Sequence, residues 1–340
     1  MNRPLLPVRS LLPGLLGVVL VLTSGLVFGA AGRTPVIFDT DICDDIDDTW
    51  ALALLLQAPE LDCKLVTTAV HDTEAKARVV AKYLDRADRT EIPIGIGVKQ
   101  PGSSGRQTGW AGDYALSSYP GRVLTDGVQA IIDTIMNSPT RVTLIAVGPL
   151  PNVAAALRRE PRIARKADFI GMHGSVYLGY NGKAPPSAEY NVKADVEAAK
   201  TVFTAPWPIT ITPLDTCGLV VLRGDKYQKI LQRNSPITRN LLENYRVWFR
   251  DGLRGRQDLD DTGRDRLTDE KLKTSSTVLF DTVAIYLAIR KDLVEMKPLP
   301  IRITDDGFTR VEEGAKTVDC AVQWSDLDGY ERWLVERLTR

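Results

Sequence analysis

Short apolar runs alternate with segments whose apolar residues recur at helical spacing, from Thr34 to the end of the chain. The short runs are typical of buried strands and lie at Pro35–Phe38, Lys64–Val70, Ile92–Val98, Arg141–Val147, Asp168–Met172 and Pro208–Pro213. The helical spacing predicts helices at Trp50–Gln57, Glu74–Asp85, Gly127–Asn137, Asn152–Arg158, Phe280–Arg290 and Asp326–Leu338. This alternation predicts an α/β fold: an open, mixed but mostly parallel sheet with helices on both faces.

The first 31 residues have a different pattern. Arg3 and Arg9 precede an almost wholly apolar stretch from Leu11 to Phe28, and small residues follow it. This order is typical of a secretory signal peptide over residues 1–31, which leaves 32–340 as one catalytic domain and predicts export to the periplasm or medium. The alternative is an uncleaved membrane anchor, because the apolar run approaches the length that spans a bilayer.

Composition narrows the class of partner. Of 340 residues 44% are hydrophobic, which is enough for a full core, and Lys+Arg and Asp+Glu both number 43. The balanced charge gives no reason to expect a nucleic-acid partner. Four cysteines could form up to two disulfides in an oxidising compartment or remain buried thiols, and spacing leaves both open. The charged, glycine-containing stretch Asp251–Thr274 predicts an exposed or mobile insertion.

An acidic cluster follows the first predicted strand directly. Six of the ten residues from Asp39 to Asp48 are aspartates. Carboxylates that lie close together repel one another and raise each other's pKa, and a hard divalent cation with oxygen ligands relieves that repulsion. Active sites of such sheets lie at the strand carboxyl ends, so the cluster predicts a cation site, with calcium favoured over magnesium. The alternative is a solvated acidic loop that caps the next helix.

Five sequence blocks, in order, resemble the inosine–uridine-preferring nucleoside hydrolases over nearly all of the mature chain. The first is the aspartate cluster before an Ala-Leu-rich helix, which is similar to the family's DxDPGxDD motif. The others are Val147–Asn152 (VGPLPN), Gly171–Gly174 (GMHG), Ala188–Ala199 (AEYNVKADVEAA) and Phe280–Ala284 (FDTVA). The resemblance implies an enzyme that hydrolyses the N-glycosidic bond of ribonucleosides to free base and ribose, with Ca²⁺ as cofactor and a dimeric or tetrameric assembly.

The resemblance also implies roles for individual residues. Asp41, Asp48, Asp281 and the backbone carbonyl of Pro151 would bind the metal, and Asp41 would take the proton from the attacking water. The residues implied to contact the nucleoside are Asp47, Asp72, Met172, Asn181, Glu189 and Asn191. The chain departs from the family pattern in the acidic loop, which is two residues longer, has Cys43 where a glycine is expected, and leaves the roles of Asp44 and Asp45 open.

A further departure concerns the leaving base. The family often has a histidine before the second metal aspartate, where it protonates the base, but this chain has Phe280. Its two histidines, His71 and His173, lie elsewhere. Aromatic stacking by Trp110 or Trp248 is an alternative means of activating the base, so base preference stays open.

Two other functions deserve comparison. An exported ribose- or nucleoside-binding protein would keep the metal and sugar residues and lose the leaving-group acid, as Phe280 suggests, whereas Asp41 argues for catalysis. Asp39-Thr40-Asp41 after a strand also fits a phosphatase of the haloacid dehalogenase type, but the downstream residues do not supply that enzyme's usual arrangement. Base release from a nucleoside separates the first alternative from a hydrolase.

Overall fold

A computed structural model describes Met1 and residues 32–340 of the chain. The predicted signal peptide at residues 1–31 therefore lies almost wholly outside the described residues. Arg33–Arg340 forms one compact unit. Within the described residues, no helix has both the length and the apolar character needed to cross a membrane.

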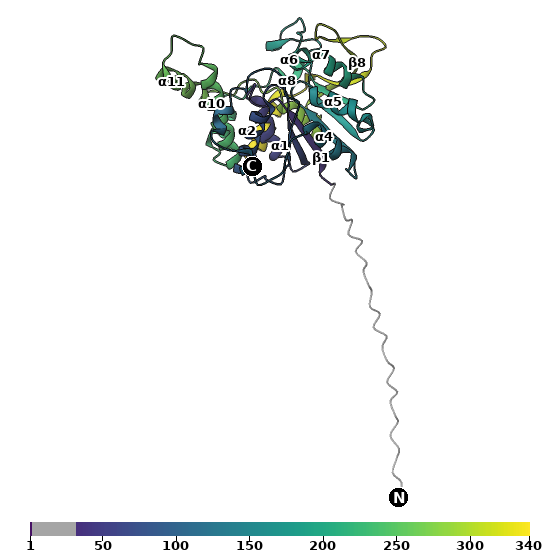
Figure 1. Cartoon of the computed structure of the whole chain (residues 1–340), viewed down its shortest axis with the longest axis horizontal. Coiled ribbons are helices and arrows are strands. Elements are labelled where there is room, and N and C mark those ends of the chain that lie inside the picture. The colour runs from purple at the N-terminus through teal and green to yellow at the C-terminus, as the bar shows by residue number, and fades with distance from the viewer. Residues whose placement is uncertain (2–31) are drawn as a thin grey trace. The chain divides into compact units, whose positions relative to one another are not determined.

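The core of this unit is a sheet of ten strands (Figure 1). They are β1 (Thr34–Thr40), β2 (Leu61–Thr68), β3 (Ile94–Ile96), β4 (Val123–Leu124), β5 (Val142–Ala146), β6 (Ala167–Met172), β7 (Ile209–Thr212), β8 (Val294–Ile303), β9 (Thr309–Val311) and β10 (Thr317–Trp324). Their order is β4-β3-β2-β1-β5-β6-β7-β10-β8-β9. All neighbours pair in parallel up to β10, and β8 then runs antiparallel to both β10 and β9. The predicted mixed, mostly parallel sheet is confirmed.

Thirteen α-helices connect and cover the strands in the described part of the chain. They are α1 (Asp47–Leu56), α2 (Thr73–Arg86), α3 (Thr108–Ala111), α4 (Gly127–Met136), α5 (Pro151–Arg159), α6 (Tyr190–Ala194), α7 (Val196–Thr204), α8 (Leu214–Cys217), α9 (Gly224–Gln232), α10 (Pro236–Gly252), α11 (Asp261–Leu272), α12 (Thr282–Ile289) and α13 (Leu327–Leu338). Three 3₁₀ turns are η1 (Leu116–Ser118), η2 (Pro161–Arg165) and η3 (Tyr180–Gly182). Helices α10 and α11 extend to one side of the body in Figure 1.

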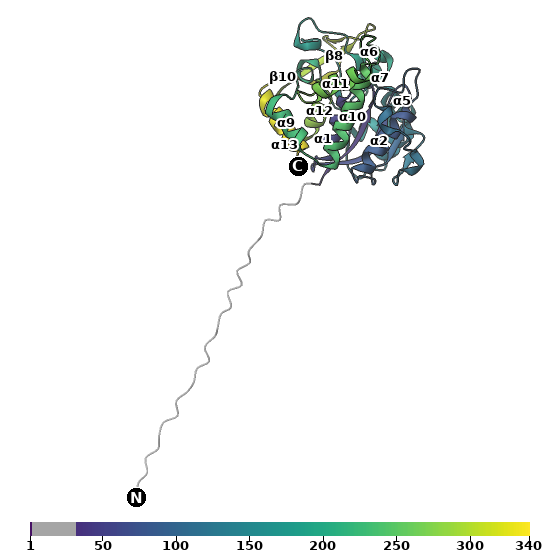
Figure 2. The same ribbon diagram turned by 90° about the vertical axis from the view of Figure 1, so that its left-hand side faces the viewer.

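Side chains of the central strands alternate between two hydrophobic layers. Val36 and Phe38 of β1 pack with α1, α2, α12 and α13, while Ile37 between them packs with α4, α5 and α7. Figure 2 looks onto the first layer, where α9, α10, α12 and α13 lie. Every residue of α1 is buried, as expected for a helix that is apolar on all sides. The start of α1 is therefore fixed firmly at the strand ends.

The predicted elements match the central part of the sheet. All six predicted strands and six predicted helices coincide with observed elements to within a few residues. The stretch Asp251–Thr274 is an exposed insertion, but it includes α11, which ion pairs such as Arg250–Asp265 hold against α10. The four cysteines are all free and buried, so the disulfide alternative is wrong for this structure.

Candidate active site

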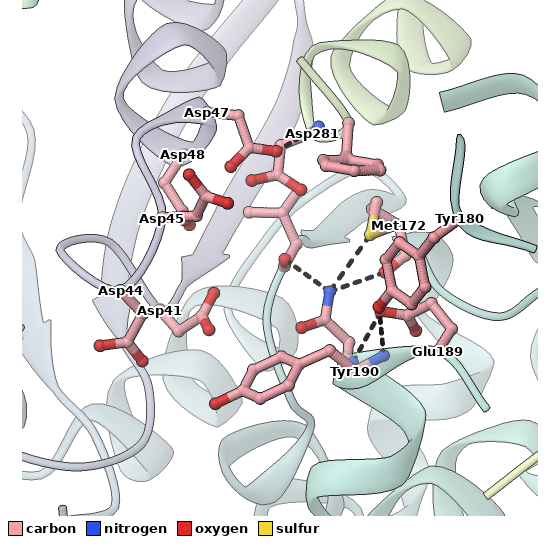
Figure 3. A pocket seen from close by; sticks show the side chains of 13 residues that line it. Asp41, Asp44, Asp45, Asp47, Asp48, Met172, Tyr180, Glu189, Tyr190 and Asp281 are labelled. Carbon is pink, nitrogen blue, oxygen red and sulfur yellow. Dashed lines mark hydrogen bonds between the residues drawn. The ribbon is translucent and has the colours of Figure 1, made fainter. Parts of the chain in front are cut away.

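A cavity of about 280 Å³ opens at the carboxyl ends of the central strands (Figure 3). Asp41 follows β1, Val147 follows β5, and Met172 ends β6. The starts of α1, α6 and α12, the acidic loop after β1 and the turn η3 contribute the other side chains. The full lining is Asp41, Asp44, Asp45, Asp47, Asp48, Val147, Met172, Tyr180, Glu189, Tyr190, Asn191, Phe280 and Asp281. Polar side chains on rigid element ends, around a concave space, define a site for a small molecule.

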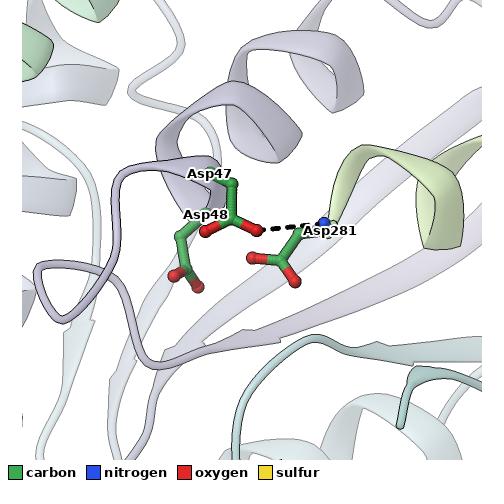
Figure 4. A group of neighbouring side chains, drawn as sticks. All are labelled: Asp47, Asp48 and Asp281. Atoms are coloured by element: carbon green, nitrogen blue, oxygen red, sulfur yellow. Dashed lines mark hydrogen bonds between the residues drawn. The ribbon is translucent and has the colours of Figure 1, made fainter. Parts of the chain in front are cut away.

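Three buried carboxylates form a close group in the site (Figure 4). Asp47, Asp48 and Asp281 each present an oxygen, and these oxygens lie within 4.8 Å of one another. The Asp281 backbone N–H donates to Asp47 Oδ2 at 3.2 Å, and Thr40 Oγ1 donates to Asp48 Oδ1. Carboxylate oxygens at this spacing fit a hard divalent cation.

The local sequence explains why these carboxylates meet. Asp47 and Asp48 form the first turn of α1, and Asp281 is the N-cap residue of α12. The two helices pack against each other. Negative side chains are stabilised at helix N-termini, where backbone N–H groups lack partners. Two helix starts therefore deliver three carboxylates to one point.

Burial makes the ionised form of these carboxylates energetically unfavourable unless a cation balances their charge. Desolvation, with repulsion from neighbouring aspartates, raises the pKa values of Asp47, Asp48 and Asp281 well above the ordinary range. Burial also raises the pKa of Asp41 to about 7, although Lys76 opposes this shift. A bound cation would stabilise all of these groups in the ionised form. The donor set of the structure therefore fits the metal that its sequence implies.

Asp41 is held on two sides. Its backbone carbonyl accepts a hydrogen bond from Lys76 Nζ at 2.9 Å. Its carboxylate lies against Gly148, where an added Cβ would come within 2.5 Å of Asp41 Oδ1. The glycine after β5 is therefore required by close approach, and a side chain there would push the carboxylate out of place.

The opposite wall presents Glu189 and Asn191. Glu189 caps α6, and its carboxylate accepts backbone N–H groups of Gly174, Asn191 and Val192. Burial raises its pKa to about 7 despite these bonds. Asn191 Nδ2 donates to the carbonyls of Val147 and Met172 at 2.9 and 3.0 Å. Both side chains are rigid, and each still presents acceptor oxygens to a ligand with hydroxyl groups.

Aromatic side chains form the mouth of the cavity. Phe280 and Tyr180 meet edge to face with ring centroids 6.3 Å apart. Tyr180 Oη accepts the backbone N–H of Tyr190 at 3.0 Å, which fixes the turn η3 over the site. Tyr180 and Tyr190 are 40% and 49% exposed, so they border the opening. This wall offers apolar faces to a flat ring.

Most of the predicted site residues line the cavity, and three do not. Asp41, Asp47, Asp48, Met172, Glu189, Asn191 and Asp281 all lie on it. Pro151 is instead the first residue of α5, and Val147 is the member of that motif that lines the cavity. Asp72 caps α2 and lies 3.5 Å from Lys99, while Asn181 is exposed on η3 next to Tyr180.

The tryptophans and histidines considered for leaving-group activation also lie off the cavity. Trp110 Nε1 donates to Glu243, and Trp248 Nε1 donates to the Asp44 carbonyl at 3.2 Å. His173 is buried, with Nε2 3.0 Å from the Gly148 carbonyl, and burial lowers its pKa to about 4. His173 therefore contacts the backbone after β5 and does not line the cavity.

Three residues that line the cavity were not predicted from the sequence: Val147, Tyr180 and Tyr190. Val147 precedes Gly148 at the end of a predicted strand, which is the signal that could have identified it. Tyr180 and Tyr190 belong to the segment between β6 and α7, which has no periodic pattern. Asp44 and Asp45, whose roles were open, both line the cavity.

The sequence matches a known family of enzymes. The inosine-uridine preferring nucleoside hydrolase family matches residues 36–330, and the chain belongs to this family. Its members hydrolyse N-glycosyl bonds, so the predicted enzyme class is confirmed.

Individual proteins are similar to this chain over almost its full length. The non-specific ribonucleoside hydrolase RihC of Escherichia fergusonii is 29% identical over 337 residues, which cover 91% of this chain and 99% of that protein. A plant nucleoside hydrolase, PpNRh1, has a TM-score of 0.73 at 24% identity over 91% of this chain and 99% of its own. A purine-preferring ribonucleoside hydrolase from Gardnerella vaginalis has a TM-score of 0.71 at 20% identity, over 90% and 98% of the two chains. The structural matches confirm the fold.

Proposed function

We propose that the protein is a calcium-dependent hydrolase that cleaves the N-glycosidic bond of ribonucleosides to give free base and ribose. The observation that carries this proposal is the convergence of Asp47, Asp48 and Asp281 opposite Glu189 and Asn191 in one cavity. Asp48 and Asp281 of this group fit a cation that binds vicinal hydroxyls, and Asp47, Glu189 and Asn191 fit the sugar hydroxyls. The relatives named above support a ribonucleoside as substrate.

The chain's own residues have distinct tasks in this mechanism. Asp41 lies at the edge of the carboxylate group, and we assign it the role of general base for the attacking water. Asp47, Glu189 and Asn191 hold the ribose hydroxyls and exclude bulk water. Positive charge develops on the sugar as the bond to the base breaks, and the surrounding carboxylates stabilise it.

We assign the cation to Asp48 and Asp281, with Asp41 as a third carboxylate. The cavity position of Val147 favours its carbonyl over that of Pro151 as the backbone ligand. A bound Ca²⁺ would lower the pKa of its water and orient the sugar. Oxygen ligands supplied by the protein favour Ca²⁺ over Mg²⁺, which keeps most of its waters.

The direct test measures free ribose released from a panel of purine and pyrimidine ribonucleosides, with the purified protein before and after chelator treatment. We expect release from at least one nucleoside, its loss on chelation, and recovery when Ca²⁺ is restored. Recovery with Mg²⁺ but not Ca²⁺ would contradict the metal assignment. Binding of nucleoside without release from any member would support the binding-protein alternative instead.

Phe280 leads to a prediction about leaving-group activation. No histidine is among the described residues that line the cavity, so a departing base lacks an imidazolium donor there. We expect Phe280→His to speed ribose release from nucleosides by about tenfold, which is below the roughly 10²- to 10⁴-fold of an evolved general acid because the new group is not optimally placed. p-Nitrophenyl riboside is the control, since its leaving group departs as a stable anion. An equal gain with both substrates would contradict this explanation.

We also propose that the protein is exported and forms dimers or tetramers. The export proposal relies on the signal-like pattern of residues 1–31, and the assembly proposal relies on family resemblance. Cell fractionation tests the first, and light scattering of the purified protein tests the second.

A further inference from the structure

Lys76 of α2 is fully buried beneath the acidic loop. Its Nζ donates to the Asp41 carbonyl at 2.9 Å, to Asp44 Oδ2 at 2.9 Å and to the Ala69 carbonyl at 3.2 Å. An ammonium group has three N–H donors, so these three acceptors use all of them. Lysine is almost never fully buried unless it is paired. Lys76 therefore connects the Asp41 carbonyl, the Asp44 carboxylate and the Ala69 carbonyl through one buried amine.

The acceptors of Lys76 belong to the acidic loop after β1 and to the end of β2. The Asp41 carbonyl also accepts the Asp44 backbone N–H at 3.3 Å, so Lys76 holds the first turn of the loop. Ala69 follows β2, so the same amine connects the end of β2 to the loop after β1. Two further donors hold the loop from outside: the Arg106 N–H bonds the Cys43 carbonyl, and Trp248 Nε1 bonds the Asp44 carbonyl.

We propose that Lys76 is a positioning residue that preorganises the Asp41–Asp48 loop for its cation. This inference rests on the proposed function, because the loop carries the carboxylates assigned to Ca²⁺. Within the loop, mutual repulsion of the aspartates favours spreading. The contacts of Lys76 oppose that spreading on the side away from the cavity, and they leave the side chains of Asp41 and Asp48 directed to the ligand space.

When Lys76 is replaced by a neutral residue, loss of its charge and loss of its positioning role should change the Ca²⁺ affinity in opposite directions. Removal of a positive charge near a cation site strengthens the attraction for Ca²⁺, because the local potential becomes more negative. Loss of the anchor weakens binding, because the loop must be ordered again when the ion binds. The direction of the change in affinity therefore separates the two roles.

The experiment compares Lys76→Met with Lys316→Met. Lys316 is the matched control because its Nζ also donates to two backbone carbonyls, those of Ala205 and Trp207, and it does not line the cavity. Calorimetric titration of Ca²⁺ into the chelator-treated protein gives the dissociation constant. Hydrogen–deuterium exchange of Asp41–Asp48 without metal gives the order of the loop.

We expect Lys76→Met to weaken Ca²⁺ binding about 10- to 100-fold, as loss of a residue supporting metal ligands does, and to speed exchange in the loop. Lys316→Met should change neither. Unchanged or tighter Ca²⁺ binding, or unchanged exchange, would overturn the proposal. If the wild-type protein binds no Ca²⁺, the proposed function fails, and the exchange measurement alone decides the role of Lys76.

A double variant tests whether general destabilisation, instead of loss of loop positioning, weakens Ca²⁺ binding. Lys76→Met leaves the half-buried carboxylate of Asp44 with His71 Nδ1, at 3.1 Å, as its remaining side-chain partner. Loss of the amine partner can destabilise a protein by itself. Lys76→Met with Asp44→Asn removes the charge of that carboxylate. We expect this variant to regain thermal stability while Ca²⁺ binding stays weak, and a return to wild-type affinity would overturn the proposal.

Discussion

Replacing Asp41 by asparagine is expected to lower the rate of ribose release by about 10²- to 10⁴-fold, the range that a general base contributes. The substitution keeps the shape of the side chain and one carbonyl oxygen. It removes the carboxylate that lies against Gly148 and near the buried group of Asp47, Asp48 and Asp281. The fold should persist, because the backbone contacts of Asp41 with Lys76 and Asp44 do not involve its side chain.

Asp326→Asn provides the matched control for this prediction. Asp326 caps α13 by accepting the Gly329 N–H, and asparagine is an equally good N-cap residue. The control should keep both stability and activity. Steady-state kinetics on the preferred nucleoside is the measurement. If Asp41→Asn stays within about tenfold of the wild-type rate, another group is the base.

Without metal, the protein is expected to lose stability as the pH rises. Burial raises the pKa of Asp41 from 3.8 to about 7 and that of Glu189 from 4.5 to about 7. A carboxyl group whose pKa is raised in the folded state stabilises the fold below its unfolded pKa, and this contribution is lost as the pH rises through the folded pKa. The window therefore runs from about pH 4 to slightly above pH 7. The shift at Asp41, which interacts with the neighbouring aspartates, corresponds to on the order of 4 kcal/mol of unfolding free energy over that window.

Calcium should reverse this trend. The ion binds ionised carboxylates, so its stabilisation increases with pH, and about 4 kcal/mol is available at 1,000 times the dissociation constant. Thermal unfolding between about pH 5 and pH 8, with chelator and with Ca²⁺, tests the prediction. A melting temperature that rises with pH in chelator, or that does not respond to Ca²⁺ at pH 8, would contradict it.

The central sheet could be predicted from sequence because its strands are buried on both faces. Such strands are short continuous apolar runs, as in Pro35–Phe38 and Arg141–Val147, and both coincide with observed strands. Strands toward the two ends of the sheet could not be predicted in the same way. Strand β8 contains Pro298 and Pro300 and is mostly exposed or half-buried, so its pattern resembles a loop. Strand β4 has only two residues.

The site could be predicted where a residue type has a chemical reason to follow a strand or start a helix. Asp41, Asp48 and Asp281 are of this kind, and the structure places all three on the cavity. The proposed backbone ligand is harder to predict, because any residue has a carbonyl and only the fold shows that Val147 lines the cavity and Pro151 does not. Lys76 has no motif to identify it, since its role depends on tertiary contacts between α2 and the loop.

The two walls of the cavity differ in how deeply they are built into the molecule. The carboxylates start α1 and α12, which are interior helices, whereas Tyr180 and Tyr190 belong to a surface segment and are 40% and 49% exposed. A substitution in the surface segment disturbs few core contacts, while one at the helix starts disturbs the centre of the fold. The architecture therefore combines one wall that is built into the core with a rim of two exposed tyrosines. Different leaving groups can be accommodated by changes at Tyr180 and Tyr190 themselves, while the buried side chains of Glu189 and Asn191, which flank Tyr190, keep their place against the sugar.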